Sequence, residues 1–360
     1  MAPPVPPPVA TAVRLADISV PAHSASATSL HAFPSPPLSS FPGATPGISA
    51  LLRRSCESFG ARFWIVDNSA SMMTGDGHSL IGGAVHASSR WEELSLSLQH
   101  HAQLAADVRV PLSFVLLNEP GLRAPRTLSV GLGEPGEEMR RVRLLLEAGP
   151  TGRTPLCRRI REVQSEIEAL APALREAGQR ALVVIASDGE ATDGDLGAAL
   201  RPLRELPVWV VVRLCTDSDA VVNYWNKVDE ELELDIDVLD DLVGEGKEVG
   251  ALNPWLVYAQ DLHLLREWGL TEKLFDVLDS KKLTPPEISK FLSLLLGGRI
   301  AHPSEGWPAF ERSVDAALAA SLNGGLVYDP QRRGGKKVPW VNKKALRKAM
   351  GMKGGGCVVL

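Results

Sequence analysis

Apolar residues alternate between strand-like runs and helix-like spacing along the middle of the chain. Uninterrupted runs rich in β-branched and aromatic residues, typical of strands buried on both faces of a sheet, lie at 63–66, 180–186 and 208–215. After residue 154 the spacing changes, and one face of a helix is expected to carry Leu156, Ile160, Val163, Ile167 and Leu170. Strands that alternate with helices predict an α/β fold with a doubly wound, mostly parallel sheet.

Weaker patterns suggest the remaining elements of this sheet. A long helix is expected over residues 84–106, and further strands at 109–117 and 126–132. Apolar residues that alternate with acids predict a half-exposed edge strand, with Leu232, Leu234, Ile236 and Val238. The α/β domain is therefore expected to span residues 57–245.

The two flanks of this domain differ from it in composition. Residues 1–46 are dense in Pro, Ser and Ala, which predicts a disordered segment with polyproline character. Residues 251–325 show apolar periodicity typical of helices, punctuated by prolines, and predict a helical extension.

Polar residues follow two of the buried runs at the points where they end. Asp67, Ser69 and Ser71 come directly after the run at 63–66, and Asp188 follows the run at 180–186. Thr154 lies between them and is expected at the N-cap of a helix, with a proline at its first position. Ligands bind outside the carboxyl ends of parallel strands, and small oxygen donors there suit a hard cation such as Mg²⁺.

A resemblance to a known family emerges when these residues are taken in chain order. The metal-ion-dependent adhesion site of the von Willebrand factor A (VWA) domain family is matched at all five positions, by Asp67, Ser69, Ser71, Thr154 and Asp188. Thr151 is a weaker alternative to Thr154, because it lies further from the helix start. The resemblance covers residues 57–245 at most and implies a Rossmann-like fold.

The same resemblance implies how such a site would work. The three hydroxyl groups would ligate Mg²⁺ or Mn²⁺ directly or through water, and the two carboxylates would act partly through water. An incompletely satisfied ion keeps an open coordination position, and in the family that position accepts an acidic residue from a partner protein.

Enzymatic interpretations of these residues fit less well. A haloacid-dehalogenase-type phosphatase needs a second acid where Ser69 stands, and a serine hydrolase needs Gly-x-Ser-x-Gly with a histidine. No P-loop is present, and the eight histidines, including His100 and His101, show no metal-ligand spacing. Because a nucleophile–base constellation is missing, we expect a non-enzymatic protein.

The C-terminal residues differ from the rest of the chain in net charge. The chain carries a net charge of −5, but residues 330–360 hold nine Lys or Arg and no acid. Residues 1–329 therefore hold 29 basic against 43 acidic residues, a net charge of −14. The last four residues, Cys357 to Leu360, fit a CaaX box whose terminal Leu favours geranylgeranylation of Cys357.

A lipid chain together with a basic tail predicts attachment to the cytoplasmic face of a membrane. Nucleic-acid binding is not expected, because Trp340 alone interrupts the basic residues. The four cysteines show no disulfide or zinc pattern, which fits a cytoplasmic setting. The sequence thus predicts an intracellular VWA-domain protein that binds a partner through Mg²⁺. The alternative is a soluble assembly or chaperone-like subunit beside an ATPase, with an unmodified tail.

Overall fold

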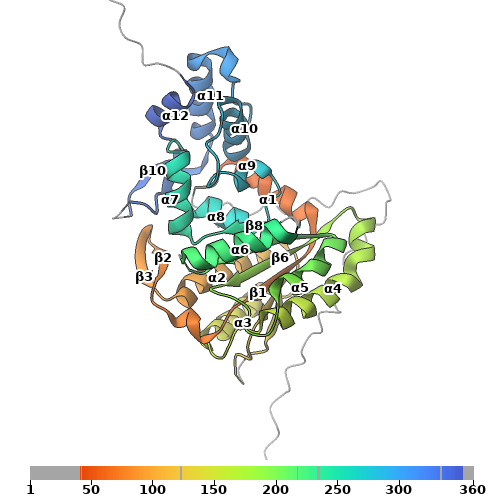
Figure 1. The fold of residues 1–360 in the computed structure, drawn as a ribbon. Coiled ribbons are helices and arrows are strands. Elements are labelled where there is room, and N and C mark those ends of the chain that lie inside the picture. Colours follow the sequence, from red (N-terminus) through yellow and green to blue (C-terminus); the bar gives the residue numbers. More distant parts are fainter. Residues whose placement is uncertain are drawn as a thin grey trace, which may run out of the picture.

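A six-stranded sheet organises the protein (Figure 1). The computed structural model describes residues 41, 43–121, 124–216, 218–232, 236–332 and 335–351. In spatial order the strands are β5 (Thr127–Val130), β4 (Leu112–Leu116), β1 (Phe59–Val66), β6 (Arg180–Ser187), β7 (Val208–Leu214) and β8 (Ile236–Leu239). Only the β4–β5 pairing within this sheet is antiparallel. The α/β class and the mostly parallel sheet predicted from the sequence are confirmed, and the arrangement is consistent with a Rossmann-like fold.

The order of the strands creates a switch point at the centre of the sheet. From β1 the chain moves outward to β4 and β5 on one side, and later returns to β6 on the other side of β1. In open parallel sheets, such a reversal opens a crevice at the carboxyl ends of the two central strands. The residues that follow β1 and β6 therefore occupy the position in the fold best suited to bind a ligand.

Side chains of β1 alternate between two apolar layers, as expected for a strand buried on both faces. Phe63 and Ile65 pack with α4 (Leu156–Glu176), α5 (Leu196–Leu200) and α6 (Asp219–Leu232). Trp64 and Val66 face a second layer that includes α1 (Pro46–Ser58) and α2 (Arg90–Val108). Helix α3 (Pro135–Glu147) packs on α2 and β5. In α4, the predicted positions Leu156, Ile160, Val163 and Ile167 are buried, and Leu170 is partly buried.

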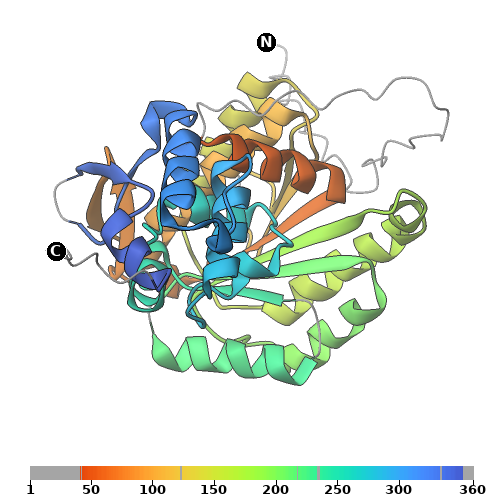
Figure 2. The same ribbon diagram turned by 90° about the horizontal axis from the view of Figure 1, so that it is seen from above.

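The C-terminal helices gather over the second layer (Figures 1 and 2). They are α7 (Leu242–Leu252), α8 (Gln260–Glu267), α9 (Lys273–Asp276), α10 (Pro285–Leu296), α11 (Trp307–Ala319) and α12 (Lys343–Ala349). Strands β9 (Leu326–Tyr328) and β10 (Lys337–Pro339) form a hairpin among them. Short 3₁₀ helices lie at Ala70–Met73, Arg201–Glu205, Pro303–Glu305 and Leu322–Gly324. The apolar side chains of the C-terminal helices and of one face of the sheet form one continuous cluster.

Buried ion pairs also join the C-terminal helices to the sheet. Arg266 on α8 donates to Asp237 on β8 and to Glu245 on α7, both at 2.8 Å. Arg213 on β7 pairs with Glu93 on α2 and, at 3.2 Å, with Glu267 on α8. All these side chains are almost fully buried. Removal of either member of an ion pair would therefore leave the other as an unpaired buried charge.

The helix predicted over residues 84–106 is wrong in its first part. A hairpin of β2 (Gly77–Ile81) and β3 (Ala84–Ser88) precedes α2. Gly82 and Gly83, with φ of 58° and 83°, supply the left-handed turn that this hairpin needs. The helix begins only after Ser89, whose side chain and that of Glu92 form a capping box.

The disorder predicted for residues 1–46 is wrong at its C-terminal end. Phe41 and Ala44 are buried in the apolar cluster, and Thr45 caps α1. The backbone of Gly43 donates to Asp261 at 2.8 Å and accepts from the indole of Trp340 at 3.0 Å. Local composition could not show this, because both partners lie about 200 residues or more away in the sequence. Residues 1–40 lie outside the described part of the chain.

Several predicted strands are shorter than expected. The segment 109–117 holds β4 only from Leu112, because Arg109 ends α2 in the left-handed conformation. The segment 126–132 contains β5, and the segment 232–238 contains only the start of β8, since Leu232 ends α6. Strand β8 lies at the predicted sheet edge, whereas β7 matches its prediction closely. Among the described residues, no helix is long and apolar enough to cross a membrane.

Candidate functional site

The candidate site lies where β1 and β6 end, at the switch point of the sheet. The two strands pair in parallel, and the backbone N–H of Asp67 donates to Ala186 at 2.8 Å. Asp67 and Asp188 therefore leave the same edge of the sheet side by side. This juxtaposition follows from the strand pairing alone, which is why the sequence could predict it.

Hydrogen bonds connect four of the five predicted ligands. The backbone of Ser69 donates to Asp67 at 2.8 Å, and the hydroxyls of Ser69 and Ser71 lie 3.0 Å apart. The hydroxyl of Ser71 then donates to Asp188 Oδ1, also at 3.0 Å. Adjacent ligands in an octahedral Mg²⁺ site, at about 2.1 Å from the ion, are about 3.0 Å apart. The hydroxyls of Ser69 and Ser71 and Oδ1 of Asp188 thus fit Mg²⁺ or Mn²⁺ in both chemistry and spacing.

The loop that carries the fifth predicted ligand, Thr154, is fastened to the same edge. Its residue Thr151 donates a backbone N–H to Asn68 at 2.7 Å, and its residue Gly152 accepts one from Ala70 at 3.1 Å. The carbonyl of Thr154 accepts from Thr192, beyond Asp188, at 2.9 Å. Thr154 is buried and Thr151 is exposed.

The predicted role of Thr154 as a helix cap is wrong. Helix α4 starts at Leu156, and its N-cap residue is Pro155, which makes no side-chain capping hydrogen bond. Asp193 on the loop after β6 instead accepts from the backbone of Cys157 at 3.0 Å and of Arg158 at 2.8 Å. A carboxylate suits this place, because it complements the positive end of the helix dipole.

Asp67 lies in a nearly dry environment. It is fully buried, and Ser187 donates its hydroxyl to Oδ2 at 2.6 Å. Burial raises the pKa of Asp67, and the hydrogen bonds from Ser187 and Ser69 counter only part of this shift. Ser187 was not singled out in the sequence, although it is the last residue of β6 and precedes Asp188.

Arg90, which the sequence did not place at the site, contacts Asp188. Its Nη1 lies 2.8 Å from Asp188 Oδ2, while its Nε and Nη2 bind Asp76 at 2.7 and 2.6 Å. The guanidinium holds the pKa of Asp76 below its ordinary value. This one guanidinium thus donates to two of the three neighbouring carboxylates, Asp76 and Asp188, and Oδ1 of Asp188 accepts from the hydroxyl of Ser71.

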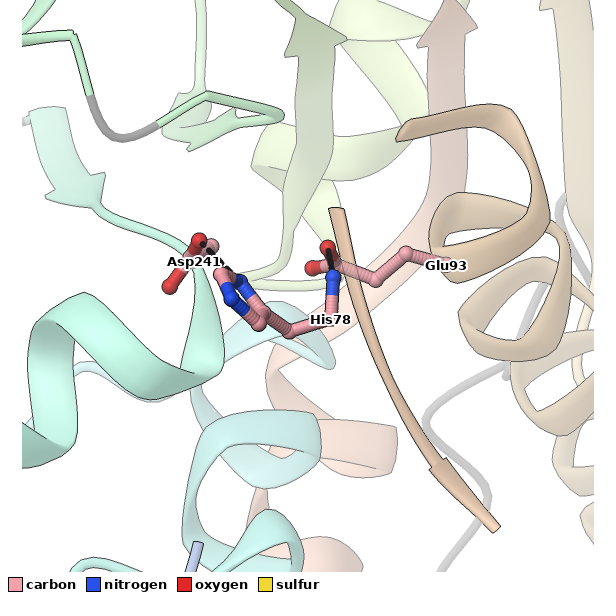
Figure 3. Close-up of side chains that lie close together, drawn as sticks. All are labelled: His78, Glu93 and Asp241. Carbon is pink, nitrogen blue, oxygen red and sulfur yellow. Dashed lines mark hydrogen bonds and ion pairs between the residues drawn. The ribbon is translucent and has the colours of Figure 1, made fainter. Parts of the chain in front are cut away.

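A second group that could hold a metal ion lies beside the β2–β3 hairpin (Figure 3). It consists of His78 on β2, Glu93 on α2 and Asp241, the N-cap of α7. One ligand atom from each lies within 4.8 Å of the others. This group could not be predicted from the sequence, because its members are 15 and 148 residues apart and follow no ligand spacing.

Part of the basic tail belongs to the folded structure. Trp340 is fully buried, and the residues around it form β10 and α12. Cys357 lies outside the described residues, so its geranylgeranylation stays a prediction of the sequence. Comparison with protein-family models gave no match, and comparison with curated proteins gave none either.

Proposed function

We propose that the edge site binds Mg²⁺ or Mn²⁺ and uses the bound ion to recruit an acidic side chain of a partner protein. The edge site consists of Asp67, Ser69, Ser71, Thr154 and Asp188. The observation that carries this proposal is the chain of oxygen atoms at 3.0 Å spacing from Ser69 through Ser71 to Asp188. This is the arrangement that the resemblance to the VWA family leads one to expect.

Burial supports a role in recognition at the surface. Asp67 and Ser69 are buried, whereas Ser71 is exposed, so the site has one face toward the protein and one toward solvent. A divalent cation bound there would receive rigid ligands from the protein side and could take a partner's carboxylate on the open side. The chain's own residues supply binding and orientation, which makes the proposed activity non-enzymatic.

The bound ion would also change the electrostatics of the loops. Two carboxylates of the edge site and Asp76 are close together, and Arg90 donates to two of these three, Asp76 and Asp188. A cation would relieve the repulsion between Asp67 and Asp188, which contributes to the raised pKa of Asp67. Cation binding should therefore stiffen the three loops and prepare the surface for the partner.

The test is a Mn²⁺ titration followed by electron paramagnetic resonance, in which free Mn²⁺ gives a strong signal. Wild type should bind about one Mn²⁺, and Asp188→Asn should weaken the affinity at least about tenfold, because it removes a charge beside the ion. Glu190→Gln is the matched control, since Glu190 is an exposed acid on the same loop. Unchanged Mn²⁺ binding by Asp188→Asn would contradict the proposed site.

Partner recognition is tested separately, by affinity capture from cells with mass-spectrometric readout in Mg²⁺ or EDTA. Proteins retained by wild type and Glu190→Gln in Mg²⁺ should be lost in EDTA and with Asp188→Asn. If the retained proteins are indifferent to both changes, the ion does not mediate recognition, even where Mn²⁺ binding is measured.

A further inference from the structure

The His78–Glu93–Asp241 group joins three elements that are far apart in the sequence. His78 lies near the start of β2, Glu93 in the first turn of α2 and Asp241 between β8 and α7. Figure 3 shows their side chains converging between the hairpin and the N-terminus of α7. The convergence is a product of tertiary packing, and it brings together one imidazole and two carboxylates.

The distances suit a small divalent cation. His78 Nδ1 lies 3.4 Å from Asp241 Oδ2, and Glu93 Oε2 accepts the backbone N–H of His78 at 2.7 Å. In a tetrahedral zinc site with ligands at about 2.0–2.1 Å, neighbouring ligand atoms are about 3.3 Å apart. The imidazole and the carboxylate of Asp241 already have this separation.

The ring nitrogen of His78 lacks a hydrogen-bond partner. Its Nδ1 atom is buried and, within the described part of the chain, makes no hydrogen bond, although the side chain as a whole is 33% exposed. A buried polar atom that makes no hydrogen bond costs free energy, and a cation bound between this nitrogen and the carboxylate of Asp241 would remove that cost. The exposed part of the ring leaves a route from solvent to the group.

Neighbouring groups hold both carboxylates in place. Arg213 donates to Glu93 Oε1, and the backbone of Gly244 donates to Asp241 Oδ1 at 2.6 Å. Hydrogen bonds of this kind orient metal ligands and reduce the rearrangement that binding requires. Beside the group lies a cavity of about 30 Å³, lined in part by His78, Glu93 and Leu242, which has room for a water molecule.

We propose that His78, Glu93 and Asp241 bind Zn²⁺, with water at the fourth position. The imidazole nitrogen favours zinc over Mg²⁺, because Mg²⁺ prefers oxygen ligands in octahedral geometry. The ion ties the β2–β3 hairpin to helices α2 and α7. The β2–β3 hairpin already lies beside the C-terminal hairpin (Figure 2). At its tip, the backbone of Gly83 lies against the ring of Tyr328 in β9.

This zinc site is independent of the edge site, because the two share no residue. Zinc would have a structural role, because it would hold the β2–β3 hairpin, which precedes α2, against α7, which follows the sheet. Its expected signature is therefore a higher melting temperature in zinc, with no requirement for Mg²⁺.

The experiment is a titration of the full chain with Zn²⁺ by calorimetry, supported by Co²⁺ absorption as a probe of tetrahedral coordination. Wild type should bind about one Zn²⁺, and His78→Ala should lower the affinity more than about a hundredfold. His86→Ala is the matched control, since His86 is an exposed histidine on the other strand of the same hairpin. It should bind zinc like wild type.

A second variant separates loss of the metal from loss of folding. Asp241→Asn keeps an oxygen to cap α7 but removes the charged ligand, so it should fold and bind zinc weakly. Zinc should raise the melting temperature of wild type and His86→Ala, but not of Asp241→Asn. Zinc binding by His78→Ala and Asp241→Asn at wild-type affinity would overturn the proposal. Failure of wild type to bind micromolar Zn²⁺ or to show tetrahedral Co²⁺ absorption would do so as well. Asp188→Asn should leave zinc binding unchanged, so failure of the edge site and failure of this site are distinguishable.

Discussion

Two buried carboxylates, Asp67 at the edge of the sheet and Glu267 in its interior, face opposite electrostatic conditions. Glu267, in the interior, accepts from Ser97 at 2.5 Å, from His101 at 2.8 Å and from Arg213 at 3.2 Å. Burial opposes its ionisation, but hydrogen bonds from histidines hold its pKa well below the ordinary value. Asp67, at the edge, is equally buried, receives hydroxyl and N–H donors, and has a raised pKa.

The difference shows where this fold leaves negative charge uncompensated. Around Glu267 the chain supplies its own cations, so that this carboxylate links the sheet to α8 in its ionised form. At the edge, Arg90 is shared between Asp76 and Asp188, and Asp67 is left with neutral donors. Burial of an acid therefore does not by itself mark a cation site in this protein. The deficit of positive charge is what distinguishes the proposed edge site from Glu267.

The largest expected effect comes from removing the negative charge of Glu267, which Arg213 compensates in the interior. Glu267→Gln removes the charge that faces Arg213 and should lower the free energy of unfolding by about 3–5 kcal/mol, because a buried guanidinium loses a partner. Urea unfolding followed by circular dichroism measures this loss. Glu137→Gln is the control, since Glu137 forms an exposed pair with Arg140, and its unfolding curve should match that of wild type. Equal effects of the two variants would remove the basis of the comparison.

An intermediate case is Asp261, a buried carboxylate held by a backbone N–H. It accepts from Gly43 at 2.8 Å, and burial raises its pKa to about 6 from 3.8. The folded state therefore binds a proton more tightly than the unfolded state does. The stability that this proton contributes is complete below pH 3.8 and is lost as the pH rises through 6.

Asp261→Asn tests this sign directly. Between pH 4 and pH 7, wild type should lose on the order of 2 kcal/mol more unfolding free energy than the variant, whose amide stays neutral. Urea unfolding at a series of pH values gives this difference, with Asp315→Asn, an exposed acid, as the control. Parallel pH profiles of wild type and Asp261→Asn would show that Asp261 stays ionised, like Glu267.

The sequence predicted those parts of the fold and site that depend on local pattern. Continuous apolar runs identified β1, β6 and β7, and parallel pairing then brought Asp67 and Asp188 to one edge. Arg90 could not be placed, because it reaches Asp188 across 98 residues through packing of α2. The same limit applies to Asp193, which caps a helix that begins 37 residues earlier.

Alternation of acids with apolar residues proved ambiguous in the predicted edge strand. The pattern predicts a half-exposed strand at a sheet edge, yet Asp237 is buried against Arg266. A sequence pattern cannot show whether a charged face meets water or a buried guanidinium on a later helix. His78, Glu93 and Asp241 were missed for a related reason, since each lies on a different element and none follows a metal-ligand spacing.

The smallest expected effect concerns Arg90 and sharpens the comparison most. Arg90→Met keeps the aliphatic stem but removes the cation that offsets Asp76 and Asp188. Mn²⁺ should then bind the edge site about fivefold more tightly, which corresponds to about 1 kcal/mol for a partly exposed ion pair. The electron paramagnetic resonance titration measures this change, and Arg140→Met, at an exposed pair elsewhere, should leave the affinity unaltered.

The sign of that change decides what Arg90 does. It binds Asp188 through Oδ2 and leaves Oδ1 to Ser71, so it can both compete with the ion electrostatically and orient the carboxylate. Tighter Mn²⁺ binding means that competition dominates and that the edge is a site of charge deficit. Weaker binding means that orientation dominates. The edge would then depend on a cation supplied by the chain, as Glu267 does, and differ from the interior only in its exposure.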